Sequence, residues 1–279
     1  MTGVVTVCVI PGVLAGMFCF YLWLLSPCCS RRERLKPFED VLIAHRGLFD
    51  NASEAPENSM AAFRKAVDAG FGIELDVQMT SDGKLVVFHD MTLKRMTGME
   101  GGVTEHTYEE LLQYPLGQSG ERIPLFSQVL EMVDGRVPLV VEIKVGLRYK
   151  RTTAAVERAL RPYQGLYCME CFHPLALAWY RKHVPSVLRG QLSEDYRYEE
   201  VWLPRPVRFI LTNMLLNFLA RPDFISYNHR DQGKHSFRIC RKLLKGKTAA
   251  WTIRNQGELE AARGMFDVFI FDSFLPERQ

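Results

Sequence analysis

The sequence predicts an α/β fold, a closed (β/α)8 TIM barrel in which parallel strands alternate with helices. After residue 139, short apolar runs alternate with helical stretches, which is the pattern of a parallel sheet covered by helices. Two earlier strand candidates, 41–44 and the apolar run that begins at Gly72, bring the parallel strands to eight. The 279 residues of the chain are also sufficient, since such a barrel takes roughly 250 residues.

The remaining elements follow in a regular order. The later strand candidates are 139–143, 166–171, 187–191, 223–227, 248–252 and 268–271. The helix candidates are 58–69, 125–133, 152–160, 175–183, 207–220, 236–244 and 256–265. Residues 91–120 are polar and contain glycines, with one short helical piece at 108–112. We therefore expect an irregular insertion there, within one barrel domain that spans residues 41–279.

The N-terminal segment predicts a membrane anchor. Val4–Leu25 is almost wholly apolar and has the ~20 residues that a bilayer-spanning helix needs. Residues 1–30 carry no charge, whereas four basic residues follow between positions 31 and 36. Because positive flanks stay in the cytoplasm, we expect a single-pass transmembrane helix within 1–30, a basic juxtamembrane linker at 31–40 and a cytoplasmic domain. A cleaved signal peptide is the alternative, but it lacks a positive n-region and a small-x-small cleavage site.

Charge and cysteine content argue against two classes of site. The net charge of +3 is weak and no groove-reading motif is present, so we expect no nucleic-acid partner. Cys168 and Cys171 have CxxC spacing, but a metal or redox site needs a second pair or a histidine partner. We interpret both as small residues of a buried strand. The seven cysteines form no apparent disulfide framework, which fits a reducing compartment.

A hairpin carries the first chemical residues. Glu74 and Asp76 are two positions apart on the apolar run, so both side chains face the same side of a strand. Thr80–Gly83 reads as a tight turn, and the run that follows must pair antiparallel because no crossover fits. Counting back from the turn places His89 roughly level with Glu74, and a register shifted by one residue is the alternative, which would turn a side chain to the other face.

The barrel prediction brings further residues to the same place. In such barrels the chemistry lies at the C-terminal ends of the strands. His45 directly follows the strand candidate 41–44, Glu142 lies near the end of 139–143, and Lys144 directly follows it. We therefore expect these three side chains to meet the two hairpin carboxylates at one mouth of the barrel.

This combination of residues favours phosphodiester chemistry. Glu74, Asp76 and Glu142 would repel one another unless a cation neutralised them, and Mg²⁺ or Ca²⁺ prefers oxygen ligands. Alternatively, one or more of the acids pairs only with Lys144 or Arg46. His45 and His89 can serve as base and acid for one displacement. General acid–base catalysis lowers the activation barrier by only roughly 3–5 kcal/mol. Further electrostatic stabilisation of the transition state is therefore needed, and the cation and the two basic residues would supply it.

Five ordered motifs resemble the glycerophosphodiester phosphodiesterase family. They are Ala44-His45-Arg46-Gly47, Pro56-Glu57-Asn58-Ser59, Ile73-Glu74-Leu75-Asp76-Val77, Val86-Val87-Phe88-His89-Asp90 and Glu142-Ile143-Lys144. The resemblance runs from about residue 41 to the C-terminus and is densest before residue 145. It implies a distorted TIM barrel of the phospholipase C-like phosphodiesterase type, and hydrolysis of glycerophosphodiesters to sn-glycerol 3-phosphate and an alcohol. It also implies attack by the substrate's own glycerol hydroxyl, giving a cyclic phosphate that water then opens.

The resemblance assigns roles residue by residue. It implies one divalent cation, Mg²⁺ or Ca²⁺, on the three carboxylates, with His45 and His89 as general acid and base. Arg46 and Lys144 would hold the phosphate, and Glu57 is expected at or near the site. Phe172 and Trp251 resemble positions that line the substrate pocket, although core packing explains them equally well. Cys171 departs from the small polar residue that is frequent at its position in the family, which puts a hydrogen-bonding role there in doubt.

Two alternative functions remain open. The membrane anchor makes a lysophospholipase D-type activity on membrane lysophospholipids the main alternative. Arg205–Arg221 has apolar residues at helical spacing, and it forms either a barrel helix that packs inward or a helix that dips into the bilayer and admits lipid substrates. The second alternative is a catalytically inactive, membrane-tethered phosphodiester-binding module. That reading predicts missing histidines or acids, and all these positions are filled.

Overall fold

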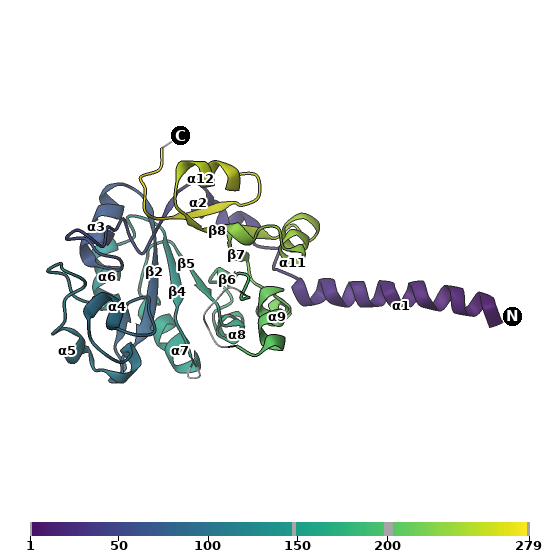
Figure 1. The fold of residues 1–279 in the computed structure, drawn as a ribbon, viewed down its shortest axis with the longest axis horizontal. Helices are drawn as coiled ribbons and strands as arrows, with labels where there is room; N and C mark the ends of the chain where they lie inside the picture. Colours follow the sequence, from purple (N-terminus) through teal and green to yellow (C-terminus); the bar gives the residue numbers. More distant parts are fainter. Residues whose placement is uncertain (1, 147–148, 198–202, 278–279) are drawn as a thin grey trace.

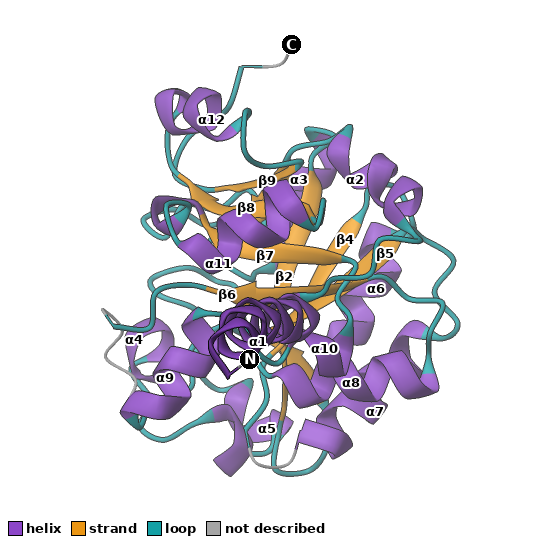
Figure 2. Cartoon of the chain, turned by 90° about the vertical axis from the view of Figure 1, so that its right-hand side faces the viewer, coloured by secondary structure: helices purple, strands orange, loops and turns teal. Residues whose placement is uncertain are grey.

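The computed structural model describes residues 2–146, 149–197 and 203–277, and for residues 2–10 it describes the backbone alone. Eight parallel strands close into a barrel, because β1 pairs with both β9 and β2. Helices surround the strands, as Figure 2 shows. The strands are β1 (Ile43–His45), β2 (Gly72–Met79), β4 (Leu139–Ile143), β5 (Tyr167–Cys171), β6 (Arg189–Ser193), β7 (Phe224–Asn228), β8 (Lys247–Ile253) and β9 (Val268–Phe271). The barrel prediction is confirmed.

The ninth strand, β3 (Leu85–Val87), pairs antiparallel with β2 as the hairpin predicts. Its register differs from the prediction by one residue. Val77 lies opposite Val87, and continuing this register places His89 opposite Leu75 rather than Glu74. The cause is the turn, which is one residue longer than expected because the Thr80 N–H donates to the carbonyl of Lys84 at 2.9 Å.

Most helices fall where the sequence predicts them. Those that cover the barrel are α3 (Met60–Asp68), α6 (Phe126–Val133), α7 (Tyr149–Leu160), α8 (Pro174–His183), α9 (Arg205–Thr212), α10 (Asn217–Ala220), α11 (His235–Arg238) and α12 (Gln256–Ala262). The expected continuous helix 207–220 is wrong, because Met214 has a φ of 53° and separates α9 from α10. Likewise, the expected helix 236–244 is α11 followed by a π-helical turn, η4 (Ile239–Leu243).

The predicted insertion at 91–120 consists of short elements around a small core of its own. These elements are α4 (Lys94–Thr97), η2 (Val103–Glu105) and α5 (Tyr108–Leu111). Apolar residues from all three, with Val86 and Phe88 of the hairpin region, form a cluster separate from the main core. The insertion therefore packs beside the end of β3 and adds side chains near His89.

The N-terminal end of the barrel is closed by residues that the sequence suggested only as a linker. Leu35 ends η1 (Arg32–Leu35), and Phe38 lies in α2 (Lys36–Glu39). Both are fully buried, and they pack with inward residues of the strands such as Ile43 and Val140. Burying an aromatic and a leucine side chain stabilises a fold by roughly 1.5–3 kcal/mol each. Residues 31–40 thus contribute to the barrel core.

Helix α1 (Thr2–Leu25) projects from one side of the barrel (Figure 1). Its end is held by side chains of the barrel helices, because Asn217 Nδ2 donates to the Leu25 carbonyl at 3.2 Å and the Trp23 ring lies 4.4 Å from that of Phe218. In the part of the chain that the structure describes, no helix combines the length and apolar character that crossing a membrane requires. The predicted span, Val4–Leu25, includes residues 4–10, whose side chains lie outside the described residues.

Candidate active site

Three carboxylates meet at the C-terminal mouth of the barrel. Asp76 on β2 lies directly beside Glu142 on β4 in the parallel register, and Glu74 is two positions earlier on the same strand. One oxygen from each carboxylate lies within 4.8 Å of one oxygen from each of the others, and each residue is at most 6% exposed. The structure thus brings together the three acids that the sequence predicted as one cluster.

The electrostatics of this trio suit a divalent cation. Burial and the charges of Asp76 and Glu142 hold the pKa of Glu74 well above its usual range. Lys144 and Arg46 offset part of the repulsion, since Nζ of Lys144 lies 2.8 Å from Glu142 and 3.1 Å from Asp76, and Nε of Arg46 lies 3.6 Å from Asp76. Among the described residues, the buried Oδ1 of Asp76 accepts no hydrogen bond of regular geometry and has Lys144 as an ion-pair partner. Buried carboxylate oxygens in such excess are ligands for Mg²⁺ or Ca²⁺, so the donor set fits the predicted cation.

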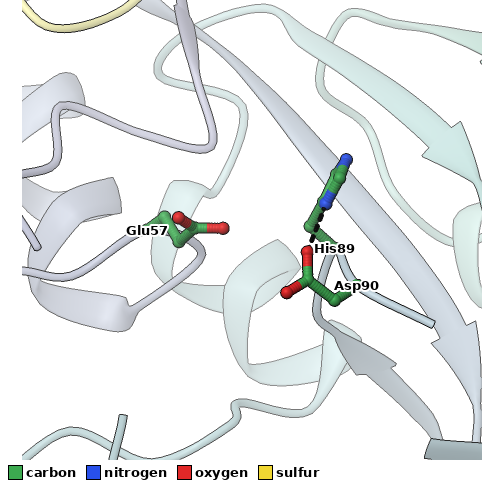
Figure 3. Close-up of side chains that lie close together, drawn as sticks. All are labelled: Glu57, His89 and Asp90. Atoms are coloured by element: carbon green, nitrogen blue, oxygen red, sulfur yellow. Dashed lines mark hydrogen bonds and ion pairs between the residues drawn. The ribbon is translucent and has the colours of Figure 1, made fainter. Parts of the chain in front are cut away.

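A second acidic group is already neutralised by an arginine. Glu57, His89 and Asp90 also place ligand atoms within 4.8 Å of one another, and Figure 3 shows the Glu57 carboxylate directed toward the other two side chains. Arg95 from α4 donates to Glu57 at 2.7 and 2.9 Å and to Asp90 at 2.6 and 2.9 Å. Because this guanidinium already bridges both carboxylates, Glu74, Asp76 and Glu142 are the better cation site.

His45 is held by a carboxylate from the last strand of the barrel. Its Nδ1 lies 2.9 Å from Oδ2 of Asp272, which follows β9. Burial and the neighbouring Arg46 charge lower the pKa of His45 to about 4, while the His45 contact lowers that of Asp272. An ionised carboxylate can only accept, so Nδ1–H donates and Nε2 keeps its lone pair. That Nε2 lies 3.9 Å from Glu74.

His89 is oriented in the same way. Its Nδ1 lies 2.8 Å from Oδ1 of Asp90 (Figure 3). The pKa of Asp90 lies well below its usual value because His89 and Arg95 both donate to it. Here too the ionised carboxylate fixes Nδ1 as the donor, which leaves Nε2 for proton transfer. The two histidines therefore present equivalent nitrogens at one rim.

The basic residues lie between the acids. Arg46 donates from Nη1 to Glu57 at 2.7 Å, and its backbone N–H donates to Glu74 at 3.2 Å. The carboxylates of Asp76 and Glu142 raise the pKa of Lys144 above its ordinary value despite burial. Gly47 permits the tight turn after Arg46, since a side chain there would lie 2.9 Å from the backbone of Ala62. Glu57, expected at the site, contacts Arg46, Arg95 and Asn51.

Aromatic rings border the Lys144 side of the mouth. The ring of Phe172 lies 5.7 Å from that of Trp251 and 6.2 Å from that of Tyr196, in edge-to-face arrangements. Nζ of Lys144 lies 5.9 Å from the Phe172 centroid. Of the two predicted aromatic residues, Phe172 therefore lies beside Lys144, and Trp251 on β8 lies beside Phe172.

Several site residues were missing from the sequence prediction. They are Asp272 on His45, Arg95 on Glu57 and Asp90, Asn58 on Asp76 at 2.9 Å, and Glu170, which lies beside Glu142 in the register. Asn58 stands inside a motif that the sequence analysis quoted, and Glu170 lies at the inward position of β5. Asp272 follows the last strand at the catalytic rim, a signal that could have found it. Arg95 lies in the insertion, where no periodicity points to it.

The paired thiols take no part in the site. Cys168 packs inside the barrel with residues such as Val140, whereas Cys171 packs in the outer core. Residues three apart on a strand face opposite sides, so the two sulfur atoms cannot share a metal ion. Sγ of Cys171 donates to the Ile143 carbonyl at 3.0 Å, and burial raises the pKa of its thiol to about 12.

The arrangement can bind an anion and transfer protons to or from it. Two imidazoles with free Nε2 atoms, two basic residues and a carboxylate trio suited to a cation surround one small volume. Cleavage of a phosphodiester replaces one oxygen substituent on a negatively charged phosphorus centre by another. The reaction therefore needs groups that stabilise the negative charge, a base for the attacking hydroxyl and an acid for the leaving oxygen. No covalent nucleophile of the chain is required for that chemistry.

Comparison with known proteins is consistent with this geometry. Residues 45–265 match the glycerophosphoryl diester phosphodiesterase family. A glycerophosphodiester phosphodiesterase of Bacillus altitudinis is 36% identical over 166 residues, which cover 55% of this chain and 66% of that protein. Bovine glycerophosphodiester phosphodiesterase 1 is 28% identical over 279 residues, covering 85% and 80% of the two chains. The first of these matches thus spans about two thirds of the relative's length.

Solved structures share the fold. An Oleispira antarctica phosphodiesterase in complex with the product sn-glycerol 3-phosphate has a TM-score of 0.66 and 24% identity, covering 84% of this chain and 92% of that one. A glycerophosphodiester phosphodiesterase from Thermotoga maritima has a TM-score of 0.65 and 23% identity, covering 84% and 94%. At these identities the likeness concerns the barrel architecture.

Proposed function

Since this chain belongs to the glycerophosphoryl diester phosphodiesterase family, and is therefore a phosphodiesterase, we propose that it hydrolyses glycerophosphodiesters to sn-glycerol 3-phosphate and an alcohol. The observation that carries the proposal is the pair of imidazoles, His45 and His89, each tied through Nδ1 to a carboxylate beside the acidic trio. A chain that only binds phosphodiesters has no need for two oriented proton-transfer groups.

His45 is the base in this proposal, because burial keeps its imidazole neutral. Asp272 accepts the proton of Nδ1–H, so the lone pair of Nε2 is available to take a proton. In the first step the glycerol hydroxyl gives its proton to His45 and forms a bond to phosphorus. The bond to the leaving alcohol breaks, and that oxygen takes a proton from His89. The product is a cyclic phosphate, which water opens with the two roles exchanged. Protons and charges balance over the two steps.

Glu74, Asp76 and Glu142 would hold one divalent cation, Mg²⁺ or Ca²⁺. When bound, it supplies positive charge that stabilises the phosphoryl oxygens and the attacking oxygen. Lys144 extends that positive field toward Phe172, and Arg46 offers a planar donor group suited to phosphate oxygens. Phe172 and Trp251 would exclude water from the side of the substrate that faces the aromatic rings.

Turnover of a headgroup panel tests the proposal. The full chain is assayed on glycerophosphocholine and related diesters, with and without chelator, beside His45→Ala and His89→Ala. Each variant is expected to lose roughly 10²–10⁴-fold in turnover, and Lys65→Ala on the outer surface of α3 serves as control. No turnover by the wild-type chain on any diester would favour the alternative of an inactive binding module. Equal rates in wild type and both variants would refute His/His catalysis.

A lysophospholipase D-type activity is the second candidate, and one observation favours it. Phe209 on α9 is 62% exposed, and α9 lies on the side of the barrel from which α1 projects (Figure 1). An exposed aromatic residue there suits contact with a lipid chain. Phe209→Ser should then reduce hydrolysis of lysophosphatidylcholine in vesicles and leave glycerophosphocholine hydrolysis unchanged. An equal effect on both substrates would exclude this role.

We also propose that α1 attaches the enzyme to a membrane, with the barrel on the cytoplasmic side. Support comes from the apolar sequence of Val4–Leu25, the basic residues after it, and the large exposed side chains of Leu14, Met17 and Phe20. The test is fractionation of cells that express the full chain, followed by alkaline carbonate extraction and protease treatment of intact vesicles. Recovery of the chain in the soluble fraction, or digestion of the barrel from outside, would contradict the proposal.

A further inference from the structure

Glu170 on β5 is a fourth buried carboxylate beside the acidic trio, and the proposed reaction gives it no role. It lies directly beside Glu142 in the parallel register of β4 and β5. Cys168, two positions earlier on the same strand, packs inside the barrel, so the Glu170 side chain also points inward. Glu170 is only 2% exposed. Its carboxyl group is therefore directed into the barrel interior at the level of the Glu142 carboxylate.

The Glu170 carboxyl group has hydrogen-bonding capacity that the described residues do not use. Its Oε2 forms no hydrogen bond of regular geometry with any of them. The residue level with it on β6 is Gly190, and the Phe224 ring fills the space that a side chain there would take. The buried Ser226 Oγ also lacks a regular hydrogen bond in the described part of the chain. Burial and the Glu142 charge raise the pKa of Glu170 to about 8, and the nearby Ser226 hydroxyl offsets part of that rise.

The acidic trio is the charged feature nearest to this pair of polar groups. Burial raises the pKa of Glu74, and the charges of Asp76, Glu142 and Glu170 add to the rise. Among the described residues, however, the group with ligand atoms within 4.8 Å of one another contains the trio and leaves Glu170 out. Glu170 therefore suits an indirect contact with a cation on the trio. Buried polar atoms without a protein partner are commonly completed by an ion or an ordered water.

We propose that Glu170 and Ser226 together hold a hydration water of the cation, which makes Glu170 a positioning residue for the cation site. Mg²⁺ loses its hydration waters reluctantly and usually keeps several of them when carboxylates bind it. Groups that orient a metal site from outside its direct ligands commonly change the metal affinity by roughly 10- to 100-fold. This role rests on the cation site of the proposed function, and it goes further because it favours Mg²⁺ over Ca²⁺.

Isothermal titration calorimetry of the full chain with MgCl₂ and with CaCl₂, after treatment with chelator, tests this role without relying on turnover. Glu170→Leu should weaken Mg²⁺ binding by roughly 10- to 100-fold. It should weaken Ca²⁺ binding less, because Ca²⁺ takes more of its ligands from protein oxygens. Glu170→Gln keeps an acceptor oxygen and should bind Mg²⁺ with an affinity between those of Glu170→Leu and wild type. Glu131→Leu, exposed on α6, is the control and should bind both ions as wild type does.

Two further measurements separate this role from a merely structural one. Ser226→Ala should also weaken Mg²⁺ binding, and it should add little in the Glu170→Leu background because both groups act on the same water. The melting temperature of Glu170→Leu in chelator should not fall below that of wild type, since the substitution removes a buried carboxyl group without a regular hydrogen bond. A structural role predicts a lower melting temperature and an unchanged affinity for Mg²⁺.

The possible failures are distinguishable. Equal Mg²⁺ affinities of wild type and Glu170→Leu would overturn the role of Glu170 and leave the cation site intact. A Glu170→Gln affinity as low as that of Glu170→Leu, or a larger loss for Ca²⁺ than for Mg²⁺, would overturn the hydration role in favour of charge or direct ligation. Absence of Mg²⁺ and Ca²⁺ binding by the wild-type chain would refute the cation site of the proposed function, and this role with it.

Discussion

Nδ1 of His45 lies 2.9 Å from Oδ2 of Asp272, so the first and last strands of the barrel meet in one imidazole–carboxylate pair. The two residues are 227 positions apart in the chain, and they become neighbours because β1 pairs with β9. Closure of the barrel therefore orients the proposed base. Asp272 acts through His45 and is a positioning residue.

Asp272→Asn should reduce kcat by roughly 10- to 100-fold, the usual effect of losing a partner that orients a functional histidine. The Asp272 charge raises the His45 pKa and partly opposes the effect of burial. Removing that charge should therefore lower the His45 pKa. The acidic limb of the pH profile of kcat/KM reports the pKa of the base in the free enzyme, so that limb should move to lower pH. Asp68→Asn, exposed on α3, is the control. An unchanged limb with reduced kcat would assign Asp272 a merely structural role.

Arg95→Ala should lower kcat by roughly tenfold or more, in the range that a displaced acid or base costs. Without the guanidinium, the Glu57 and Asp90 carboxylates repel each other, and Asp90 no longer holds His89 in place. Arg95→Lys should recover part of the activity, because lysine keeps the charge but not the bidentate geometry. The neighbour Lys94→Ala, whose ion pair with Glu100 lies exposed on the surface, is the control. Equal kcat values for Arg95→Ala and wild type would show that Arg95 does not position His89.

Much of the fold was predictable because local patterns and barrel geometry agree. Alternating strands and helices specify a parallel barrel, and the rule that chemistry lies at the C-terminal ends of strands brings Glu142 to Glu74 and Asp76. The errors are local. The turn after β2 takes one extra residue, which changes the partner of His89, and Met214 adopts a positive φ that divides an otherwise periodic helix.

The missing site residues have a common physical reason. Asp272 and Arg95 act through contacts between segments distant in sequence or placed in an irregular insertion, and hydrophobic periodicity carries no information on either. Leu35 and Phe38 were likewise hidden, because a basic segment next to an apolar helix reads as solvated linker. Their role in closing one end of the barrel follows only from the three-dimensional packing against the inward residues of the strands.

Removal of divalent cations should abolish turnover and lower the melting temperature. Adding Mg²⁺ or Ca²⁺ back should raise the melting temperature again, since a ligand at about 100 times its Kd stabilises the folded state by roughly 2.7 kcal/mol. Glu142→Gln should lose most of this shift because one ligand and one charge of the trio are gone. Glu131→Gln, exposed on α6 and outside the site, is the matched control. The same shift in both variants would place the cation elsewhere.

Glu57→Gln should destabilise the protein in a pH-dependent manner. Bonds from Arg95, with the Arg46 charge, lower the pKa of Glu57 to about 2, against an ordinary value of 4.5. A carboxyl with a depressed folded-state pKa contributes its stabilisation fully above its unfolded pKa and loses it as the pH falls through the folded value. The difference corresponds to an upper bound of about 3 kcal/mol.

Urea unfolding of wild type and Glu57→Gln at pH 7, 5 and 3 measures this contribution. The gap in free energy of unfolding should be constant between pH 7 and 5 and should shrink by pH 3, where the unfolded-state carboxyl is protonated and that of the folded state is still ionised. Glu131→Gln, exposed on α6, should show no gap at any pH. A Glu57→Gln gap that persists unchanged at pH 3 would mean that Glu57 stabilises the site through shape and hydrogen bonding, and that its charge does not hold Arg46 and Arg95 beside the catalytic rim.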